Sequence, residues 1–351
     1  MPDIQLIEVV LASQDGFSAF VDVLSPHAPF SLHILGGILN SRERTGKLEV
    51  CDSPGVTAWT SKPLTTIDSS SDLFSVLIFS SLTHQFHFFC SAESLTGPPT
   101  KDAEAHVLGT IRAVLRLAYI QAPRYDSVLR LGGDTDAPTE RMGDEPPMII
   151  IAAVHEKWTS CLRPLAVAQY ASVRYVLPPG HSKDTSNLSH EWTLSTLQES
   201  DIDAVRSTSH IPRPKEYFLS RSAYTVCIRK KGEESASQKP IAWALMHADG
   251  SIGALYVNAE YRGKGLAQVV VKELTKKLDF TEGVGASSVD DDIGGGALGW
   301  NWTDVDLLNE KAMAFFDSVG SWERGWLSHW TYMNVGSDTG LLNSFGDSRQ
   351  C

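Results

Sequence analysis

The chain of 351 residues carries a formal net charge of −12 at pH 7, and 42% of its residues are hydrophobic. This length suffices for two domains of ordinary size, each with its own buried core. The acidic balance argues against nucleic acid and against an anionic membrane surface as the main partner.

The segments that would direct a protein to a membrane or out of the cell are not found. The N-terminal stretch MPDIQLIEVVLASQDGF has no basic run before an apolar core, so it does not read as a secretory signal. The apolar runs fall short of the roughly 20 residues that a bilayer-spanning helix needs. The five cysteines are scattered and lack C-x-x-C spacing. This pattern favours free thiols, and we expect a cytoplasmic protein.

In chain order, the first elements mix helical and extended patterns. Residues 4–22 indicate a helix, whereas 30–39 are apolar but contain Gly36-Gly37, which leaves their class open. β-branched and aromatic runs over 73–79 and 85–90 predict two paired strands. The apolar spacing over 102–119 then predicts a helix.

A turn-rich acidic stretch follows over 132–147, and we interpret it as a mobile insert. Apolar residues at helical spacing then predict a long amphipathic helix over 148–168. Residues 172–177 indicate one more strand. Two prolines, a glycine and a polar run make 178–190 the best candidate for a linker. The chain therefore divides into an N-terminal α/β domain (1–177), this linker, a second domain (191–335) and a flexible tail (336–351).

The second domain has the clearest pattern. We expect strands near 192–197, 224–229, 241–247, 252–257, 300–305 and 326–333, and helices near 200–205, 215–221, 266–278 and 309–319. Asp249-Gly250 provides a hairpin turn between two of these strands. The acidic run Asp290–Asp292 is interpreted as part of a solvated surface loop.

The most informative stretch is the turn between the strand 252–257 and the helix that follows it. Its six residues are Arg262, Gly263, Lys264, Gly265, Leu266 and Ala267. Glycines at such a junction let backbone N–H groups face outward, and the first N–H groups of a helix have no partner within the helix. Together with the helix dipole they attract an anion, so we interpret the turn as a pyrophosphate cradle.

This element order, with Arg262-x-x-Gly265-x-Ala267 at a strand exit, resembles the GNAT superfamily of N-acyltransferases. Within it, the glycine N-acyltransferase branch is the most similar. The motifs that carry this closer resemblance are Trp243-x-Leu245-Met246, Gly250, Glu260-Tyr261-Arg262, Gly265-Leu266 and Val305-Asp306-x-x-Asn309-Glu310. The resemblance implies a mixed α/β (α+β) fold with a mostly antiparallel central sheet flanked by helices. It also implies that the N-terminal domain is a degenerate GNAT-like half that shapes the acceptor site.

The resemblance further implies a reaction and a set of ligand contacts. A small-molecule amine would attack the thioester of an acyl-CoA, with acetyl-CoA as the first choice, without a metal and without an acyl-enzyme. Pantetheine would enter between the strands at 252–257 and 300–305. The residues implied in binding the co-substrate are Leu255, Tyr256, Val257, Arg262, Gly263, Lys264, Gly265, Leu266, Ala267 and Asn309.

The residues expected to move protons depart from the family pattern. The glycine-type branch has a glutamate one residue after the hairpin glycine, where this chain has Ser251. Many superfamily members have a tyrosine where this chain has Phe316. His247, Asp249 or a water could take the proton, and we rank His247 first because its ordinary pKa lies near neutrality. His247 and Ser251 are the catalytic candidates.

Structural alternatives accompany several of these assignments. His247 has the pattern of a packed or capped strand residue, and Asn309 could equally be a helix N-cap. Phe315 and Phe316 fit a core, as do the tryptophans at 322, 326 and 330. The main alternative function is a non-catalytic acyl-CoA-binding or partner-binding protein with a degenerate site, and a third is O-acyl transfer on the same scaffold.

Overall fold

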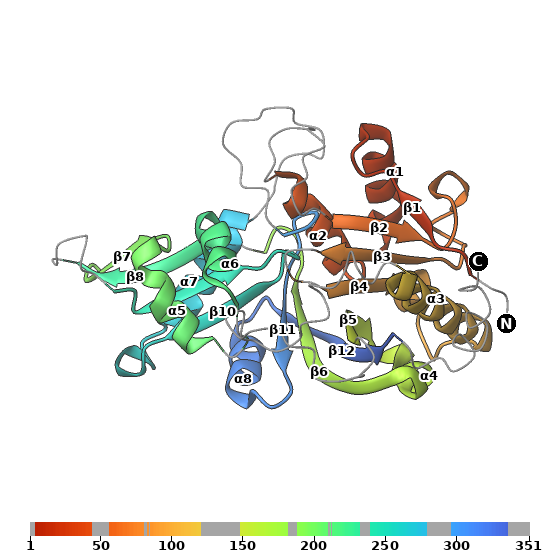
Figure 1. Cartoon of the computed structure of the whole chain (residues 1–351). Helices are drawn as coiled ribbons and strands as arrows, with labels where there is room; N and C mark the ends of the chain where they lie inside the picture. Colours follow the sequence, from red (N-terminus) through yellow and green to blue (C-terminus); the bar gives the residue numbers. More distant parts are fainter. Residues whose placement is uncertain are drawn as a thin grey trace, which may run out of the picture.

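The structure, a computed structural model, describes residues 4–43, 56–80, 83, 85–120, 148–181, 188–209, 211, 213–231, 239–278 and 296–335. The expected insert at 132–147, the acidic run at 290–292, the tail after 335 and residues 182–187 of the linker lie outside these residues. Within them the chain forms two sheets flanked by helices (Figure 1). Most strand pairs are antiparallel, so the predicted mixed α/β fold class is confirmed.

The elements of the first half are β1 (Ile7–Val9), α1 (Gln14–Leu24), α2 (Leu32–Glu43), β2 (Val56–Thr60), β3 (Ser75–Ser80), β4 (Gln85–Cys90), α3 (Lys101–Ile120), β5 (Met148–His155), α4 (Thr159–Leu162) and β6 (Ala166–Leu177). Those of the second half are β7 (Trp192–Ser195), α5 (Ile202–Thr208), α6 (Lys215–Arg221), β8 (Thr225–Lys230), β9 (Ala242–Met246), β10 (Ile252–Val257), α7 (Leu266–Leu278), β11 (Asn301–Asp306), α8 (Glu310–Ser318) and β12 (Glu323–Asn334). Both halves follow one order of elements, strand, two helices, three strands, helix, strand, helix and strand. This shared order supports the interpretation of the N-terminal half as a relative of the second, which stays a prediction.

The two halves share strands. The larger sheet has the order β1-β2-β3-β4-β5-β12-β6-β11, so two strands of the second half complete the sheet of the first. β12 lies between β5 and β6 and pairs antiparallel with both. The smaller sheet keeps only β10-β9-β8-β7. Figure 1 shows β11 and β12, in blue, crossing from the second half into the first.

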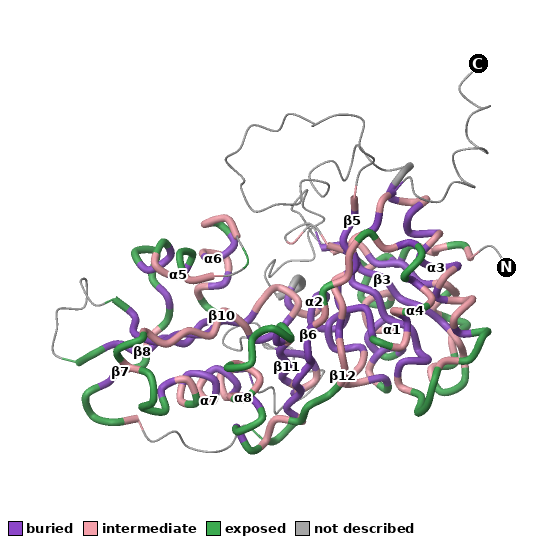
Figure 2. Tube along the Cα trace, turned by 90° about the horizontal axis from the view of Figure 1, so that it is seen from below, coloured by how far each residue is buried: buried purple, intermediate pink, exposed green. Residues whose placement is uncertain are grey.

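The cores follow from this arrangement. One face of the larger sheet buries apolar side chains against α3 and α4, and the opposite face packs on α1 and α2. In the second half, α7 covers one face of the smaller sheet, while α5 and α6 cover the other. Figure 2 shows the buried residues concentrated in the strands and in the inner faces of the helices.

A buried ion pair fastens β6 to β11, where the two halves meet. The Arg174 guanidinium donates to both carboxylate oxygens of Asp304 at 2.9 and 2.6 Å, and these side chains are only 1% and 8% exposed. Arg174 also lies 3.2 Å from Nδ1 of His33 on α2. Burial lowers the pKa of His33 well below its ordinary value, so this histidine is neutral and accepts from the arginine.

Two sequence-based predictions are wrong. Residues 4–22 are not one helix, because Ile7–Val9 pairs with β2 before α1 begins. Residues 148–168 are not a long helix either. Their apolar run, MIIIAAVH, forms β5, which is buried on both faces between β4 and β12, and 159–162 form only a short helix. A strand buried on both faces reads as a continuous apolar run, which periodicity does not separate from a helix.

The other predicted elements are found. β3 and β4 pair antiparallel as expected, and α3 covers the predicted helix. The ambiguous 30–39 stretch lies in the segment that becomes α2. In the second half every predicted strand and helix is present, with ends shifted by a few residues.

Candidate acyl-CoA site

The strand β10 leaves its pairing with β9 part-way along. Its register against β9 shifts between Gly253 and Tyr256, which is a β-bulge. At the bulge Ala254 has φ of 50°, a left-handed conformation that is uncommon for a residue with a side chain. Bulges release backbone groups from the ladder and re-aim them, often next to active sites. The middle of β10 therefore has backbone groups that do not pair with β9.

The other edge of β10 faces β11. The two strands lie next to each other but belong to different sheets, each at its edge. The expected entry of pantetheine between the strands at 252–257 and 300–305 requires such a separation. A separation of this kind leaves the edge groups of β10 available to an extended ligand.

After β10 the chain makes a tight turn into α7. Gly263 and Gly265 both have left-handed φ angles, 75° and 74°, and a Cβ built on either one would meet nothing within 4 Å. Leu266, Val270, Leu274 and Leu278 form the predicted apolar stripe, and all four are buried. The first turn of α7 has no acidic residue, so no carboxylate competes for its N–H groups.

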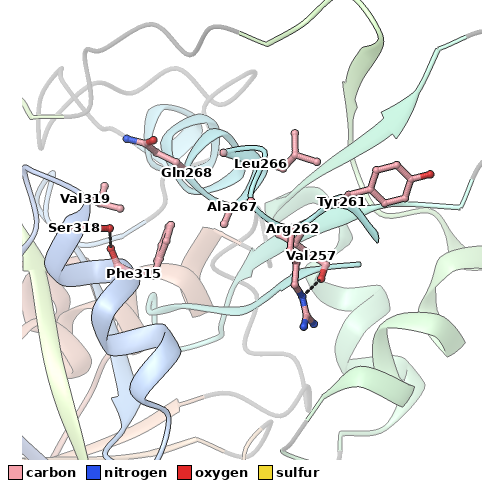
Figure 3. A pocket seen from close by; sticks show the side chains of 11 residues that line it. Val257, Tyr261, Arg262, Leu266, Ala267, Gln268, Phe315, Ser318 and Val319 are labelled. Atoms are coloured by element: carbon pink, nitrogen blue, oxygen red, sulfur yellow. Dashed lines mark hydrogen bonds between the residues drawn. The ribbon is translucent and has the colours of Figure 1, made fainter. Parts of the chain in front are cut away.

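A cavity of about 290 Å³ opens at this turn. Its walls come from the exit of β10, the turn, the first residues of α7 and the last turn of α8 (Figure 3). The residues that line it are Val257, Tyr261, Arg262, Gly263, Gly265, Leu266, Ala267, Gln268, Phe315, Ser318 and Val319. Six of these were named as co-substrate contacts from the sequence.

One cationic side chain, Arg262, lines the cavity, and a second, Lys264, lies next to it in the sequence but outside the cavity wall. Arg262 donates from Nε to the carbonyl of Val257 at 3.0 Å, which leaves its terminal nitrogens for a ligand. Its guanidinium lies 5.8 Å from the ring of Tyr256, and the Lys264 ammonium lies 5.3 Å from the ring of Tyr261. These contacts hold two positive charges beside the N-terminus of α7, where a phosphate is favoured.

Four of the named contacts lie outside the cavity wall. Leu255 packs into the core beside α7 and α8, and Tyr256 stacks on Trp243 with ring centroids 4.7 Å apart. Lys264 does not line the cavity. Asn309 accepts from the Ala312 N–H at 3.1 Å and is the N-cap of α8, which is the structural alternative given above.

Sequence reasoning missed one wall of the cavity. Phe315, Ser318 and Val319 come from α8, some fifty residues after the turn, and Phe315 was assigned to the core. Its neighbour Phe316 is the core residue, packed against Tyr175 and Trp322. Phe315 is half-buried: it packs against the same core cluster as Phe316 and also lines the cavity.

The catalytic candidates lie on the β9–β10 hairpin. His247 Nδ1 is 2.7 Å from the hydroxyl of Tyr217, and the imidazole keeps a partly accessible surface. Desolvation by burial lowers its pKa to about 4, and the nearby Asp249 carboxylate opposes this shift to a smaller extent. Ser251 is buried, and both its N–H and its hydroxyl donate to Oδ1 of Asp249, at 3.0 and 2.7 Å. That hydroxyl therefore orders the hairpin.

The corresponding turn of the first half is built differently. There the Lys157 ammonium donates to the carbonyls of Ala92, Glu93 and Leu95 just after β4. The approach to α3 contains Pro98 and Pro99, which have no N–H, and the first turn of α3 is acidic. A lysine thus occupies the first-half turn and backbone donors are missing from it, so of these two turns the one in the second half is the better candidate for binding an anion.

Two further observations concern the described part of the chain. No group of three or more His, Cys, Asp or Glu side chains there is placed to hold a metal ion. Nor does any helix in it combine the length and apolar character needed to cross a membrane.

Comparisons with known proteins add the following. The family model described as FR47-like protein matches residues 228–285, the segment with β9, β10, the turn and α7. A solved structure of a Drosophila protein is similar to this chain with a TM-score of 0.62 and 10% identity, over 95% of this chain and 99% of that one. At this identity the likeness shows a shared fold.

Two similar structures have functional names. A GCN5-related N-acetyltransferase from Sphaerobacter thermophilus is 12% identical, with a TM-score of 0.47 over 95% of this chain and 97% of that one. Another from Kribbella flavida is 12% identical, with a TM-score of 0.41 over 73% and 86%. A search of curated proteins found no match.

Proposed function

We propose that this chain is an acyl-CoA-dependent N-acyltransferase that moves an acyl group, acetyl in the simplest case, to a small amine. One observation carries the proposal, namely the cavity where the turn 262–265 meets the start of α7. Left-handed glycines, the N–H groups at the start of α7 and Arg262 lie together there, and they support the binding of a pyrophosphate. The FR47-like match lies over the same segment.

The proposed binding mode follows from this cradle. The pyrophosphate would lie on the turn, and pantetheine would extend between β10 and β11 with backbone groups of Leu255 and Val257 as partners. The thioester then reaches the bulge at Ala254. The Phe315 side of the cavity would contact the apolar part of the co-substrate.

The reaction needs orientation more than covalent help from the protein. The amine nitrogen attacks the thioester carbon, a C–N bond forms and the C–S bond breaks with its electron pair going to sulfur. The nitrogen loses a proton and the thiolate takes one, which gives amide and free CoA. Alignment of the two reactants is worth roughly 7–11 kcal/mol in favourable cases. We propose His247 as the proton acceptor, because it is neutral and partly accessible beside β10.

The narrower assignments belong to this proposal as well. An amino acid as acceptor, and membership of the glycine N-acyltransferase-like branch, are supported by the motifs around Trp243, Gly250 and Val305. The first half would shape the acceptor side. Action in the cytoplasm is supported by the free thiols of Cys90, Cys161 and Cys227.

The test measures binding and turnover separately. Calorimetry with acetyl-CoA and longer acyl-CoAs should show saturable binding. A thiol reagent should then detect CoA release when a panel of amines and amino acids is added. If none of the tested acyl-CoAs binds, the proposal is disproved.

A non-catalytic acyl-CoA-binding protein is the second candidate. It is favoured by Ser251, which lies buried against Asp249 where the glycine-type branch has a glutamate, and by the core position of Phe316. Saturable binding without CoA release, whatever amine is added, would select it.

A further inference from the structure

A buried tyrosine of α6 meets the histidine at the end of β9. We propose that Tyr217 is a positioning residue that holds the His247 imidazole with Nε2 directed at the thioester on the β10 bulge. This inference rests on the proposed function. Tyr217 and His247 are 30 positions apart in the sequence, and no sequence motif connects them.

The imidazole is fixed from three directions. Its Nδ1 lies 2.7 Å from the Tyr217 hydroxyl. The backbone of His247 is held by the hairpin, since its N–H donates to the Ser251 carbonyl at 2.7 Å. On the third side the ring lies against Gly253, and a Cβ on that glycine would collide with Nε2. These contacts hold the ring in the orientation that the structure shows.

That orientation places Nε2 beside the bulge. Gly253 directly precedes Ala254, whose left-handed φ marks the point where β10 leaves β9. Within the described part of the chain Nε2 has no hydrogen-bond partner, whereas Nδ1 has one. The Tyr217 side chain is only 1% exposed, while the histidine is partly accessible. Of the two residues, His247 is the one that keeps surface for contact with a ligand.

One tautomer of this hydrogen-bonded pair suits proton transfer. When the Tyr217 oxygen accepts from Nδ1–H, Nε2 keeps its lone pair and can accept a proton. Burial raises the pKa of Tyr217, so the phenol stays protonated. This is the tautomer that proton transfer from the attacking amine requires.

Charged groups from each neighbouring element face the pair. Asp249 of the hairpin raises the pKa of His247, whereas Arg213 before α6 and Arg221 at its end lower it. The Arg213 guanidinium lies 4.9 Å from the centroid of the Tyr217 ring. Asp249 also interacts with His87 of β4 in the first half, where it opposes the lowering of the His87 pKa by burial. These surroundings keep the imidazole neutral until it accepts a proton.

The test is the substitution Tyr217→Phe, which removes the hydroxyl and keeps the ring and its contact with Arg213. Tyr224→Phe is the matched control, because that ring also lies under an arginine, Arg221 at 4.2 Å, away from the bulge. We expect Tyr217→Phe to lower kcat about 10- to 100-fold with an unchanged KM for acyl-CoA. The pH profile of kcat should also shift. The control variant should match the unmodified protein in kcat, in KM for acyl-CoA and in the pH profile.

A second measurement does not need turnover. In the ¹⁵N-histidine NMR spectrum, a non-reactive thioether analogue of acetyl-CoA should move the Nε2 signal of His247, assigned with His247→Asn. In Tyr217→Phe the Nδ1 signal should lose its hydrogen-bonded shift.

The outcomes are distinguishable. Wild-type kcat and pH profile in Tyr217→Phe would overturn the inference, as would an Nε2 signal that the bound analogue leaves unmoved. Failure of acyl-CoA to bind the unmodified protein would instead overturn the proposed function, and with it the thioester on which this inference depends.

Discussion

Gly265 provides the sharpest test of the pyrophosphate cradle. Its φ of 74° costs a residue with a side chain roughly 1–2 kcal/mol. A Cβ there meets no protein atom within 4 Å, so Gly265→Ala creates no clash in the free protein. The methyl group instead occupies space at the cavity wall, where the backbone must approach a phosphate closely.

The expected loss of acyl-CoA affinity follows from the hydrogen bonds between backbone N–H groups and phosphate that this close approach permits. A hydrogen bond to a charged group contributes about 1.5–3 kcal/mol. The loss of one amide–phosphate bond therefore raises the acyl-CoA Kd about 10- to 100-fold, at about 1.4 kcal/mol per factor of ten. Calorimetry measures the Kd, and chemical unfolding measures the stability cost in the same preparation.

Gly97→Ala is the matched control. Gly97 has φ of 84° and equally open surroundings, and it precedes α3 in the corresponding turn of the first half. Both variants should lose similar unfolding free energy, but only Gly265→Ala should lose acyl-CoA affinity. An acyl-pantetheine without pyrophosphate should bind both variants alike. Equal acyl-CoA affinity of the two variants would refute the cradle.

Three further predictions concern charge. Arg262→Gln should raise the acyl-CoA Kd about tenfold and reduce its salt dependence, with exposed Arg206→Gln as the control. Burial raises the Glu93 pKa to about 8, so the unfolded chain ionises first and stability falls as pH rises from about 4.5 to 8. Glu93→Gln should remove this fall of about 1.4 kcal/mol per pH unit in unfolding titrations, and an unchanged slope would contradict it. Asp304→Ala should cost about 3–5 kcal/mol by leaving Arg174 unpaired in the core. Adding Arg174→Met should recover most of that loss, and no recovery would mean that the pair does not act as a unit.

Local patterns identified much of the second half. The strand–turn–helix around Arg262 to Ala267, the Asp249-Gly250 hairpin and the apolar stripe of α7 depend on residues close in sequence. Turn chemistry and helical period are local properties, so they are readable without neighbours. The same holds for the β3–β4 pair, whose strands are joined by a short connection.

The misassigned stretch shows where local patterns fail. Residues 148–155 are apolar at nearly every position, and both a buried helix and a strand buried on two faces have that composition. The segment is a strand because β4 and β12 pair with the two edges of β5. β12 begins some 170 residues later, and no pattern within 148–168 predicts this pairing.

The glycine turn at 262–265, the helix after it and the order of elements around them could be read from the sequence, because these depend on glycines, periodicity and capping within a few residues. Only the tertiary structure decided that β12 enters the sheet of the first half and that Arg174 meets Asp304. The same is true of the contribution of α8 to the cavity wall and of the contact between the Tyr217 hydroxyl and His247. Each of these depends on contacts between residues 30 to 170 positions apart. Such contacts form when whole faces are buried together, and no local pattern encodes them.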